Sequence, residues 1–584
     1  MRQSTPILVL ITLLIFSGCG GYKQIDPALD QGQNWGKAEQ KAFYQTSQGS
    51  QIIRYGWMLA LEQPNSTDLF LADNLTRFGY LPDLFPSDAD YNPEHLPVGF
   101  VRDDDEKGAW IGMTCAACHT SELKFNGRAF RIDGAPTDAD FYEFISELSK
   151  SLLKTAEDDD KFARFGARVE SQPESLGLKF SESEPDLRTD LKNEAKRFKG
   201  FVSRSTPLRP REEELQPLEE ELQPLEKELQ PWGKGRLDAV ALILNEVAYH
   251  LVPDEKINVE NPIAPVSYPF LWDTHQQPRV QWNGVSTGEL SRNTTEVLGV
   301  FAKFEADHPS KNTVQLGNLM DLEDLVEQLR SPRWKDFNFT DKIIEAKRDK
   351  LREDGKELYE KRCQSCHKVN KREEDQVGTL KVCLNPVDDK VEPVRTICED
   401  LRPINTDPAM AMNFAKRKII VEQGEDAMSV TKALGFLLPK IWWKSFYALL
   451  VGGFQQLFGE SLGESLDELR VYKARPLNGI WATAPYLHNG SVPNMMELLK
   501  PVKAPKPEDR RVTKFCVGSR EFDPDLLGFK SVPDSSKLDT NGGCGDNFLF
   551  DTILLGNRNV GHDYDNASLN NDERLAIIEF IKGE

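Results

Sequence analysis

Cysteine and histidine are scarce in this chain of 584 residues, which has nine cysteines and eight histidines. Nine cysteines are too few for a disulfide scaffold at this length, so their placement matters more than their number. Basic residues are also in deficit, with 72 Lys and Arg against 93 Asp and Glu and a net charge of -21. Because binding to nucleic acid requires a basic surface, DNA and RNA are excluded as main partners.

Long hydrophobic runs are absent from most of the chain. The mean hydropathy is -0.50, which excludes a polytopic membrane protein. Apolar residues make up 39% and charged residues 28%, the composition of a globular protein. At roughly 150 residues per domain, the length allows about three or four domains.

The first 18 residues have the pattern of an export signal. Arg2 precedes an apolar run from Pro6 to Phe16, which is too short to span a membrane. Ser17 and Gly18 then precede Cys19, an arrangement that resembles a bacterial lipobox. We expect a lipid anchor at Cys19 and a periplasmic, outer-membrane location; a plain signal peptide or an N-terminal anchor is the alternative. Disulfides and covalent haem are possible in that compartment.

Two CxxCH motifs decide the expected chemistry. Residues 115–119 read CAACH and residues 363–367 read CQSCH, which is the attachment signature of c-type haem. A thioredoxin motif would not place His after both pairs, and a zinc site needs two further ligands nearby. The sequence therefore predicts two covalent haem c groups, with thioethers and iron ligands at Cys115, Cys118, His119, Cys363, Cys366 and His367.

The remaining four cysteines fall into two local pairs. Cys383 and Cys398 form one pair, and Cys516 and Cys544 form the other. In an oxidising compartment these are the simplest disulfides, although four cysteines allow three pairings and free buried thiols are the alternative.

His488 stands out among the other histidines. It lies in RPLNGIWATAPYLHNGS (475–491), where apolar residues, a proline and a glycine turn surround one imidazole. A rigid loop that presents a ring to iron would have this composition, so His488 is our candidate for a further iron ligand.

This stretch, extended to RPLNGIWATAPYLHNGSVPNMMELL (475–499), resembles the di-haem cytochrome c peroxidase superfamily. TCAACHTSELKFNGRAFRIDGAPTDADF (114–141) and RNTTEVLGVF (292–301) resemble it too, and the resemblance extends over most of residues 40–584. It is closest to the branch that contains the rubber oxygenases. The resemblance implies a mainly α fold, with two cytochrome c-like haem domains and a loop-rich middle segment.

The expected organisation follows from this resemblance and from composition. ELQPL repeats with a proline in every unit favour a low-complexity insertion over a coiled coil. We expect a signal peptide (1–18), a linker after the lipidated Cys (19–36), an N-terminal haem domain (37–204), the insertion (205–232), a middle segment over the first haem (233–339) and a C-terminal haem domain (340–584).

Several helices are expected from periodicity and capping. They cover residues 37–63, the segment DADFYEFISELSKSLLK (138–154), the entry to the second motif (341–367) and the C-terminal residues 571–583. Residues 433–458 are hydrophobic but contain Pro439 and two lysines, which argues against a spanning helix. A membrane-surface patch and burial against the second haem domain are the alternatives.

The resemblance implies that one haem reacts with peroxide or oxygen while the other relays electrons. Carried over, His367 and His488 are the axial pair of the relay haem, and Met410 or Met412 is the alternative to His488. The reaction expected at the His119 haem is hydrogen peroxide reduction, with electrons from a small periplasmic cytochrome c or cupredoxin. An oxygenase that cleaves an apolar substrate and a non-catalytic electron carrier are the rivals. Peroxidases also carry a Ca²⁺ ion between their haem domains, which no motif here confirms.

Candidate catalytic residues come from the middle segment. Arg292 and Glu296 lie four residues apart and share a face if that stretch is helical, as peroxide cleavage by a base and a cation requires. An ordinary salt bridge is the alternative. Trp272 is a candidate electron relay or a core residue. If the distal pocket is apolar, Phe270 and Phe301 would line it and oxygen chemistry would be favoured.

Overall fold

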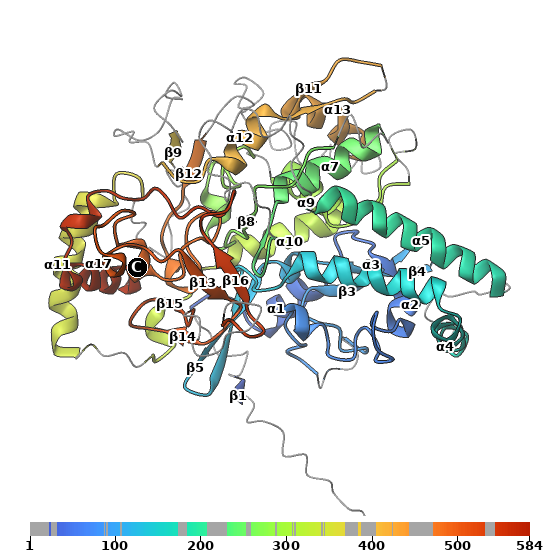
Figure 1. Cartoon of the computed structure of the whole chain (residues 1–584), viewed down its shortest axis with the longest axis horizontal. Coiled ribbons are helices and arrows are strands. Elements are labelled where there is room, and N and C mark those ends of the chain that lie inside the picture. The colour runs from blue at the N-terminus through green and yellow to red at the C-terminus, as the bar shows by residue number, and fades with distance from the viewer. Residues whose placement is uncertain are drawn as a thin grey trace, which may run out of the picture.

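The computed structural model describes residues 23–24, 32–86, 88, 92–105, 108–172, 184–206, 231–252, 259–286, 289–305, 308, 311–339, 343, 345–367, 383–386, 405–422, 424–442, 471–531 and 543–583. Helices predominate, as expected. Figure 1 places helices α2 to α5 at one end of the molecule and the pair α11 and α17 at the other. The expected signal peptide, the lipidated Cys19 and the proline repeats lie outside the described residues.

Two antiparallel hairpins flank the first CxxCH motif. β3 (Phe100–Asp105) pairs with β4 (Gly108–Met113) before the motif, and β5 (Thr120–Phe125) pairs with β6 (Arg128–Asp133) after it. Asn126 and Gly127 both have positive φ, 48° and 71°, which suits the two-residue turn between β5 and β6. The mainly α expectation did not include these strands.

The expected continuous helix over residues 37–63 is wrong. The chain forms α1 (Lys37–Gln45) and α2 (Tyr55–Ala60), separated by an extended stretch that contains β2 (Ile53–Arg54). The break has a packing reason, because Gly49 adopts φ 95° and a side chain there would collide with the carbonyl of Thr313. β2 instead pairs with β4 and extends the first hairpin into a sheet.

The helix expected after the first motif is confirmed as α3 (Phe141–Glu157). The carboxylate of Asp140 caps it by accepting a hydrogen bond from the backbone N–H of Glu143. α3 packs against α4 (Asp159–Glu170) and α5 (Glu184–Ser205). Together with α2, these helices bury one of the two largest apolar cores.

The middle segment is more helical than expected. It contains α7 (Ala239–Leu251), α9 (Glu289–Gly299) and α10 (Leu316–Gln328), which pack in sequence, α7 on α9 and α9 on α10. Residues 259–286 between α7 and α9 are largely irregular, as a loop-rich segment should be. This irregular stretch lies between the two CxxCH motifs.

The helices expected at the entry and the end of the second haem domain are α11 (Glu345–Arg362) and α17 (Asn571–Gly583). They pack closely on each other, and a buried ion pair joins Arg348 to Glu579 at 2.6 Å. At the crossing, Gly355 faces the carbonyl of Ala576 without space for a side chain. α11 delivers the second motif directly at its C-terminus.

The other elements are short. They are β1 (Lys23–Gln24), β7 (Arg236–Leu237), β8 (Val266–Ser267), β9 (Cys383–Pro386), α12 (Ala409–Lys416), β10 (Lys418–Ile419), β11 (Met428–Ser429), α13 (Val430–Trp442), β12 (Val471–Ala474), α16 (Met495–Leu498), β13 (Lys514–Val517), β14 (Phe522–Asp523), β15 (Gly528–Phe529) and β16 (Phe548–Asp551). Paired strands include β7 with β8, β9 with β12, and β13 with β16.

One predicted disulfide is present. Cys516 and Cys544 are bonded and tie β13 to the segment before β16. Cys398, the proposed partner of Cys383, lies outside the described residues.

The hydrophobic segment from residue 433 is described as far as Trp442. Its helix, α13, buries Leu437, Ile441 and Trp442 in the main core, so this part is a packing element. The indole N–H of Trp442 donates to Thr294 on α9 at 3.1 Å. Within the described ranges, no helix is both long and apolar enough to cross a bilayer.

Candidate functional site

Both CxxCH motifs fold into a single helical turn with the same hydrogen bonds. In the first, the backbone N–H of His119 donates to the carbonyl of Cys115 at 2.9 Å; in the second, that of His367 donates to Cys363 at 2.8 Å. The turn brings each pair of thiols and the following imidazole to one end of it. Gly99 permits the close approach of the chain to the first motif, since at φ 81° a side chain there would collide with Ala117.

Each motif histidine is oriented by a backbone carbonyl. The Nδ1 of His119 lies 2.8 Å from the carbonyl oxygen of Pro269, and the Nδ1 of His367 lies 2.7 Å from that of Arg475. Because a carbonyl only accepts, the proton of each ring is on Nδ1 and the lone pair on Nε2 is free to bind iron. Burial also lowers the pKa of both rings, that of His119 to about 4, so they are neutral ligands near pH 7.

The four thiols suit covalent attachment. Cys115, Cys118, Cys363 and Cys366 are free cysteines, so neither motif has closed into a disulfide. Burial raises the pKa of Cys118 and of Cys363 to about 12, which keeps both in the thiol form. Addition across a haem vinyl group requires a reduced thiol, and all four motif cysteines are in that state.

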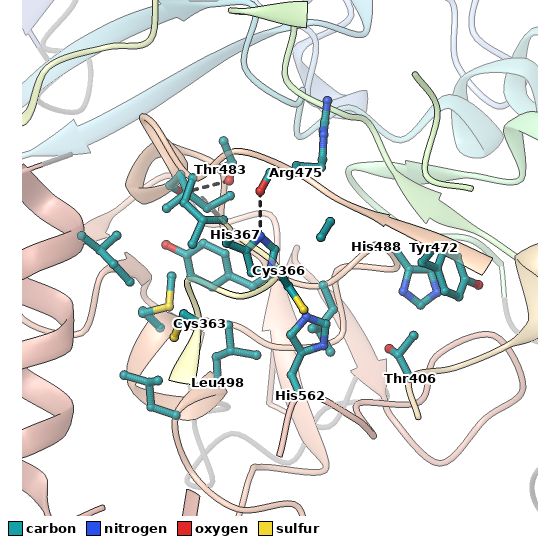
Figure 2. Close-up of a pocket in the computed structure, with 18 of the residues that line it drawn as sticks. Cys363, Cys366, His367, Thr406, Tyr472, Arg475, Thr483, His488, Leu498 and His562 are labelled. Atoms are coloured by element: carbon teal, nitrogen blue, oxygen red, sulfur yellow. Dashed lines mark hydrogen bonds between the residues drawn. The ribbon is translucent and has the colours of Figure 1, made fainter. Parts of the chain in front are cut away.

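The second motif opens into a mainly apolar pocket (Figure 2). Apart from the motif residues, its wall combines side chains of α16, α17 and the loop that carries His488. Three imidazoles line it: those of His367, His488 and His562. The structure therefore brings the predicted His488 to the pocket of the second motif, together with one histidine that the sequence did not single out.

His562, and not His488, is the imidazole beside His367. The ring centres of His367 and His562 are 6.4 Å apart and their planes differ by 28°. With a metal–imidazole bond of about 2 Å on each side, two ligands on opposite faces of one iron place their ring centres roughly 6 Å apart. Figure 2 shows His562 next to Cys366, whereas the ring of His488 lies against Tyr472, with centres 4.3 Å apart.

The loop that carries His562 is held rigidly. Arg511 donates hydrogen bonds to the carbonyls of Asn559, Gly561 and His562, and Asn566 donates to the carbonyl of His562 at 3.1 Å. His562 itself has φ 49°, a left-handed conformation that is unusual outside glycine. Its Nδ1 is buried and has no hydrogen-bond partner among the described residues, and burial lowers its pKa to about 3. A buried neutral imidazole on a fixed loop is suited to binding a metal.

Two buried cations in this pocket point to a bound anion. Arg475 has 7% of its surface exposed, and its Nε and Nη1 atoms are buried with no hydrogen-bond partner in the described part of the chain. Lys473, also buried, donates to neutral oxygens, the side chain of Gln277 at 2.7 Å and the carbonyl of Arg279 at 2.9 Å. Burial lowers the pKa of both, that of Arg475 to about 9, which indicates a site built for negative charge. The propionate groups of haem would supply that charge, so the residues present fit haem c.

The predicted catalytic residues Arg292 and Glu296 lie near the first motif, and each is bonded to a further side chain. Arg292 and Glu296 are both on α9; Arg292 makes its ion pair with Glu323, and Glu296 accepts a hydrogen bond from Gln281 at 2.5 Å. Burial is the main cause that raises the pKa of Cys115, and the negative charges of Glu296 and Glu323 are the next largest causes. The positive charge of Arg292 lowers it. These groups are therefore within electrostatic range of the first motif.

Trp272 is fully buried and contacts the segments that follow both motif supports. Its indole N–H donates to the carbonyl of Asn478 at 2.8 Å, and its ring stacks on Phe270 with centres 4.7 Å apart. Phe270 lines the His367 pocket, whereas Phe301 stacks on Phe201 in a separate aromatic group. These contacts do not test whether both phenylalanines line the distal side of the first motif, which stays a prediction.

The remaining candidates are accounted for as follows. The alternative ligand Met410 is buried in a small cluster with Tyr472 and does not line the His367 pocket. In the described ranges, no group of three or more His, Cys, Asp and Glu side chains could hold a metal ion, which leaves the expected Ca²⁺ without support. The one sequence signal for His562 was the glycine directly before it, which permits a tight turn.

Comparison with known proteins agrees with a cytochrome. A family model described as RoxA-like, cytochrome c-like matches residues 471–507, which include Arg475 and His488. The chain therefore contains a cytochrome c-like domain. It is also 29% identical to an uncharacterized protein, y4iJ, of Sinorhizobium fredii, over 99% of this chain and 98% of that protein. A second protein of that organism, y4iM, is 34% identical over 16% of this chain and 19% of its own length.

Proposed function

We propose that this chain is a di-haem c-type cytochrome oxidoreductase of the periplasm. The observation that supports it best is the repeated geometry of the two motifs, each with two thiols and an imidazole whose Nδ1 is held by a carbonyl. When bound, haem c supplies a redox-active iron at each motif. The lipid anchor at Cys19 is part of this proposal.

The two sites differ in whether a second imidazole lies beside the motif histidine, which suits one site for electron transfer and the other for reaction with peroxide. At the second site, His562 is placed to be the sixth ligand, which makes that site a relay for electrons. At the first, the ring in contact with His119 is Tyr268, and no second imidazole in the described part of the chain contacts it. The first site is therefore our candidate for the reactive one.

The reaction we propose is H₂O₂ + 2 e⁻ + 2 H⁺ → 2 H₂O at the first site. Glu296 is our candidate to carry the proton, since burial raises its pKa and the side chain of Gln281 orients it. Arg292, fixed by Glu323, supplies positive charge near the departing oxygen. Electrons enter through the second site from a small periplasmic cytochrome c or cupredoxin, and Trp272 is our candidate relay between the sites.

An oxygenase that acts on an apolar substrate is the second candidate. A group of stacked rings, Phe198, Phe201 and Phe301, belongs to the same apolar core as the first motif and favours it. A non-catalytic electron carrier is the third candidate.

Pyridine haemochrome analysis and turnover assays test the proposal. We expect two c-type haems per chain and oxidation of reduced cytochrome c that depends on hydrogen peroxide. One haem per chain would refute the di-haem assignment. Oxygen uptake with polyisoprene, in the absence of peroxide turnover, would instead identify the oxygenase. Two low-spin haems that do not respond to peroxide would identify the carrier.

A further inference from the structure

Arg475 is linked to the backbone carbonyls that orient both motif histidines. It follows β12 directly, and its main-chain carbonyl accepts the hydrogen bond from Nδ1 of His367 at 2.7 Å. Its side chain donates from Nη2 to the carbonyl of Phe270 at 3.0 Å. The residue before Phe270 is Pro269, whose carbonyl holds Nδ1 of His119 at 2.8 Å. A continuous connection thus runs from His119 through residues 269–270 and Arg475 to His367.

The guanidinium of Arg475 is confined at its position. It lies over the ring of Phe270, with 4.1 Å between Cζ and the ring centre, and beside Trp282 at 5.2 Å. No carboxylate of the described residues pairs with it, so within the chain the guanidinium is held by the ring and the carbonyl of Phe270. Its contacts are with the segment that supports the other haem site.

The two supporting segments are joined along their length. The indole of Trp272 donates to the carbonyl of Asn478 at 2.8 Å, and the backbone N–H of Lys473 donates to the carbonyl of Trp282 at 2.7 Å. The backbone N–H of Leu271 donates to Gly134, which follows β6 beyond the first motif, at 2.9 Å. A displacement of Arg475 is therefore transmitted to the residues that orient His119, because close-packed interiors transmit strain.

We propose that Arg475 is a positioning residue that couples the two haem sites, orienting His367 through its carbonyl and His119 through its guanidinium. This inference rests on the proposed function, since it requires haem at both motifs. The hydrogen bond at Nδ1 sets the orientation and basicity of an iron-bound imidazole. A change in the side chain at position 475 should therefore alter the haem at the other motif.

The Arg475→Lys variant separates the two contacts. It keeps the charge and the main-chain carbonyl that holds His367 but loses the planar Nη2 donor to Phe270. We expect low-temperature EPR and resonance Raman spectra of the His119 haem to change, while the His367 haem stays six-coordinate and low-spin. Arg475→Gln also removes the charge and should lower the reduction potential of both haems in a spectroelectrochemical titration.

Lys473→Gln is the matched control. Lys473 is a buried cation in the same pocket, but its side chain contacts Gln277 and Arg279, not residues 269–270. We expect it to shift the potential of the His367 haem and to leave the spectra of the His119 haem unchanged. An equal change of the His119 haem in Lys473→Gln would show a general charge effect and overturn the proposal.

The proposal is also overturned if Arg475→Lys binds two haems and the His119 haem keeps its wild-type spectra and potential. Where Arg475→Gln does not assemble, the lysine variant decides the matter alone. Failure of the proposed function is recognised separately, because the wild-type protein would then contain fewer than two covalent haems.

Discussion

The imidazoles of His367 and His562 face the same pocket with their ring centres 6.4 Å apart, although 195 positions separate them in the chain. The hydrogen bond from His367 to the carbonyl of Arg475 and the hydrogen bonds of Arg511 to the loop of His562 fix both rings independently. The site is therefore preorganised on both faces of the position that iron would occupy. Two neutral imidazoles make a low-spin, six-coordinate haem, which suits electron transfer more than oxygen chemistry.

Replacement of His562 tests this assignment. We expect His562→Ala to convert the second haem from low-spin to high-spin or to a state that binds exogenous imidazole, because one axial ligand is removed. His488→Ala is the matched control, since His488 lines the same pocket but packs on Tyr472. EPR and optical spectra of the ferric protein measure both. If His488→Ala makes the haem high-spin and His562→Ala does not, the sequence-based assignment to His488 is right.

Glu296→Gln tests the proton carrier at the first site. General acid–base catalysis contributes about 10²- to 10⁴-fold, so we expect kcat for peroxide reduction to fall by roughly that factor. Because the base must be deprotonated, the wild-type activity should rise as pH increases through the pKa of Glu296, which burial raises. This rising limb of the pH profile should be absent in the variant. Glu289→Gln, at the exposed start of the same helix, is the control; burial raises the pKa of this carboxyl too, so a limb that survives this change belongs to Glu296. Equal losses in both variants would indicate a structural effect on α9.

The local motifs were predictable from the sequence, and the long-range partners were not. Cys115, Cys118 and His119 lie within five consecutive residues, so a spacing pattern alone reveals them. His562 meets His367 only because α17 packs on α11 and Arg511 fixes the loop before it. Apart from Gly561, its immediate neighbours do not distinguish it from a surface histidine, whereas the apolar context of His488 reflects its packing in the pocket wall.

Secondary structure shows the same division. The predicted helix 37–63 is interrupted in its middle, where Gly49 packs against the carbonyl of Thr313. Local sequence cannot reveal this contact, because the two residues are far apart in the chain. The β3–β4 hairpin was missed because its first strand ends in three aspartates, which weaken the alternation typical of strands. By contrast, α17 has its cap, Asn570, directly before it and its apolar spacing within its own residues, and the prediction matched the structure.

The disulfide between Cys516 and Cys544 should stabilise the region around β13 and β16. The closed loop joins residues 28 positions apart, and a loop of this length contributes about 3 to 4 kcal/mol through the unfolded state. We expect the double variant Cys516→Ser and Cys544→Ser to lose stability of about that size. Urea unfolding with and without reductant measures it. A double variant as stable as the wild type, or a wild type insensitive to reductant, would argue against a stabilising role.

The stability of the first domain should depend on pH through Asp138. Burial raises the pKa of this carboxyl to about 6, and the guanidinium of Arg520, 3.7 Å away, opposes the shift. A carboxyl whose pKa is raised in the folded state stabilises the fold below its unfolded pKa of about 4, and this contribution is lost as pH rises through about 6. Asp138→Asn resembles the protonated form at every pH.

We therefore expect the free energy of unfolding of Asp138→Asn, relative to the wild type, to increase between pH 4 and pH 8 by on the order of 3 kcal/mol. Chemical unfolding at several pH values measures the difference. Asp321→Asn, at an exposed position of α10, is the control and should show no such trend. A constant difference between Asp138→Asn and the wild type would contradict the assignment.

Gly355 should be required at the crossing of α11 and α17. In an exposed helix interior, Gly→Ala stabilises by about 0.5 to 1 kcal/mol through helix propensity. At Gly355 the added methyl group would collide with the carbonyl of Ala576, and overpacking costs about 1 to 3 kcal/mol. The steric cost is larger, so we expect Gly355→Ala to lower the melting temperature and to loosen the packing of α17 on α11.

Gly166→Ala, inside α4, is the control, because a side chain there has only an ordinary contact of 3.9 Å with Leu187 and should be neutral or stabilising. Thermal unfolding of both variants separates the two effects, and a Gly355→Ala protein more stable than the wild type would show that the helices do not cross at this residue.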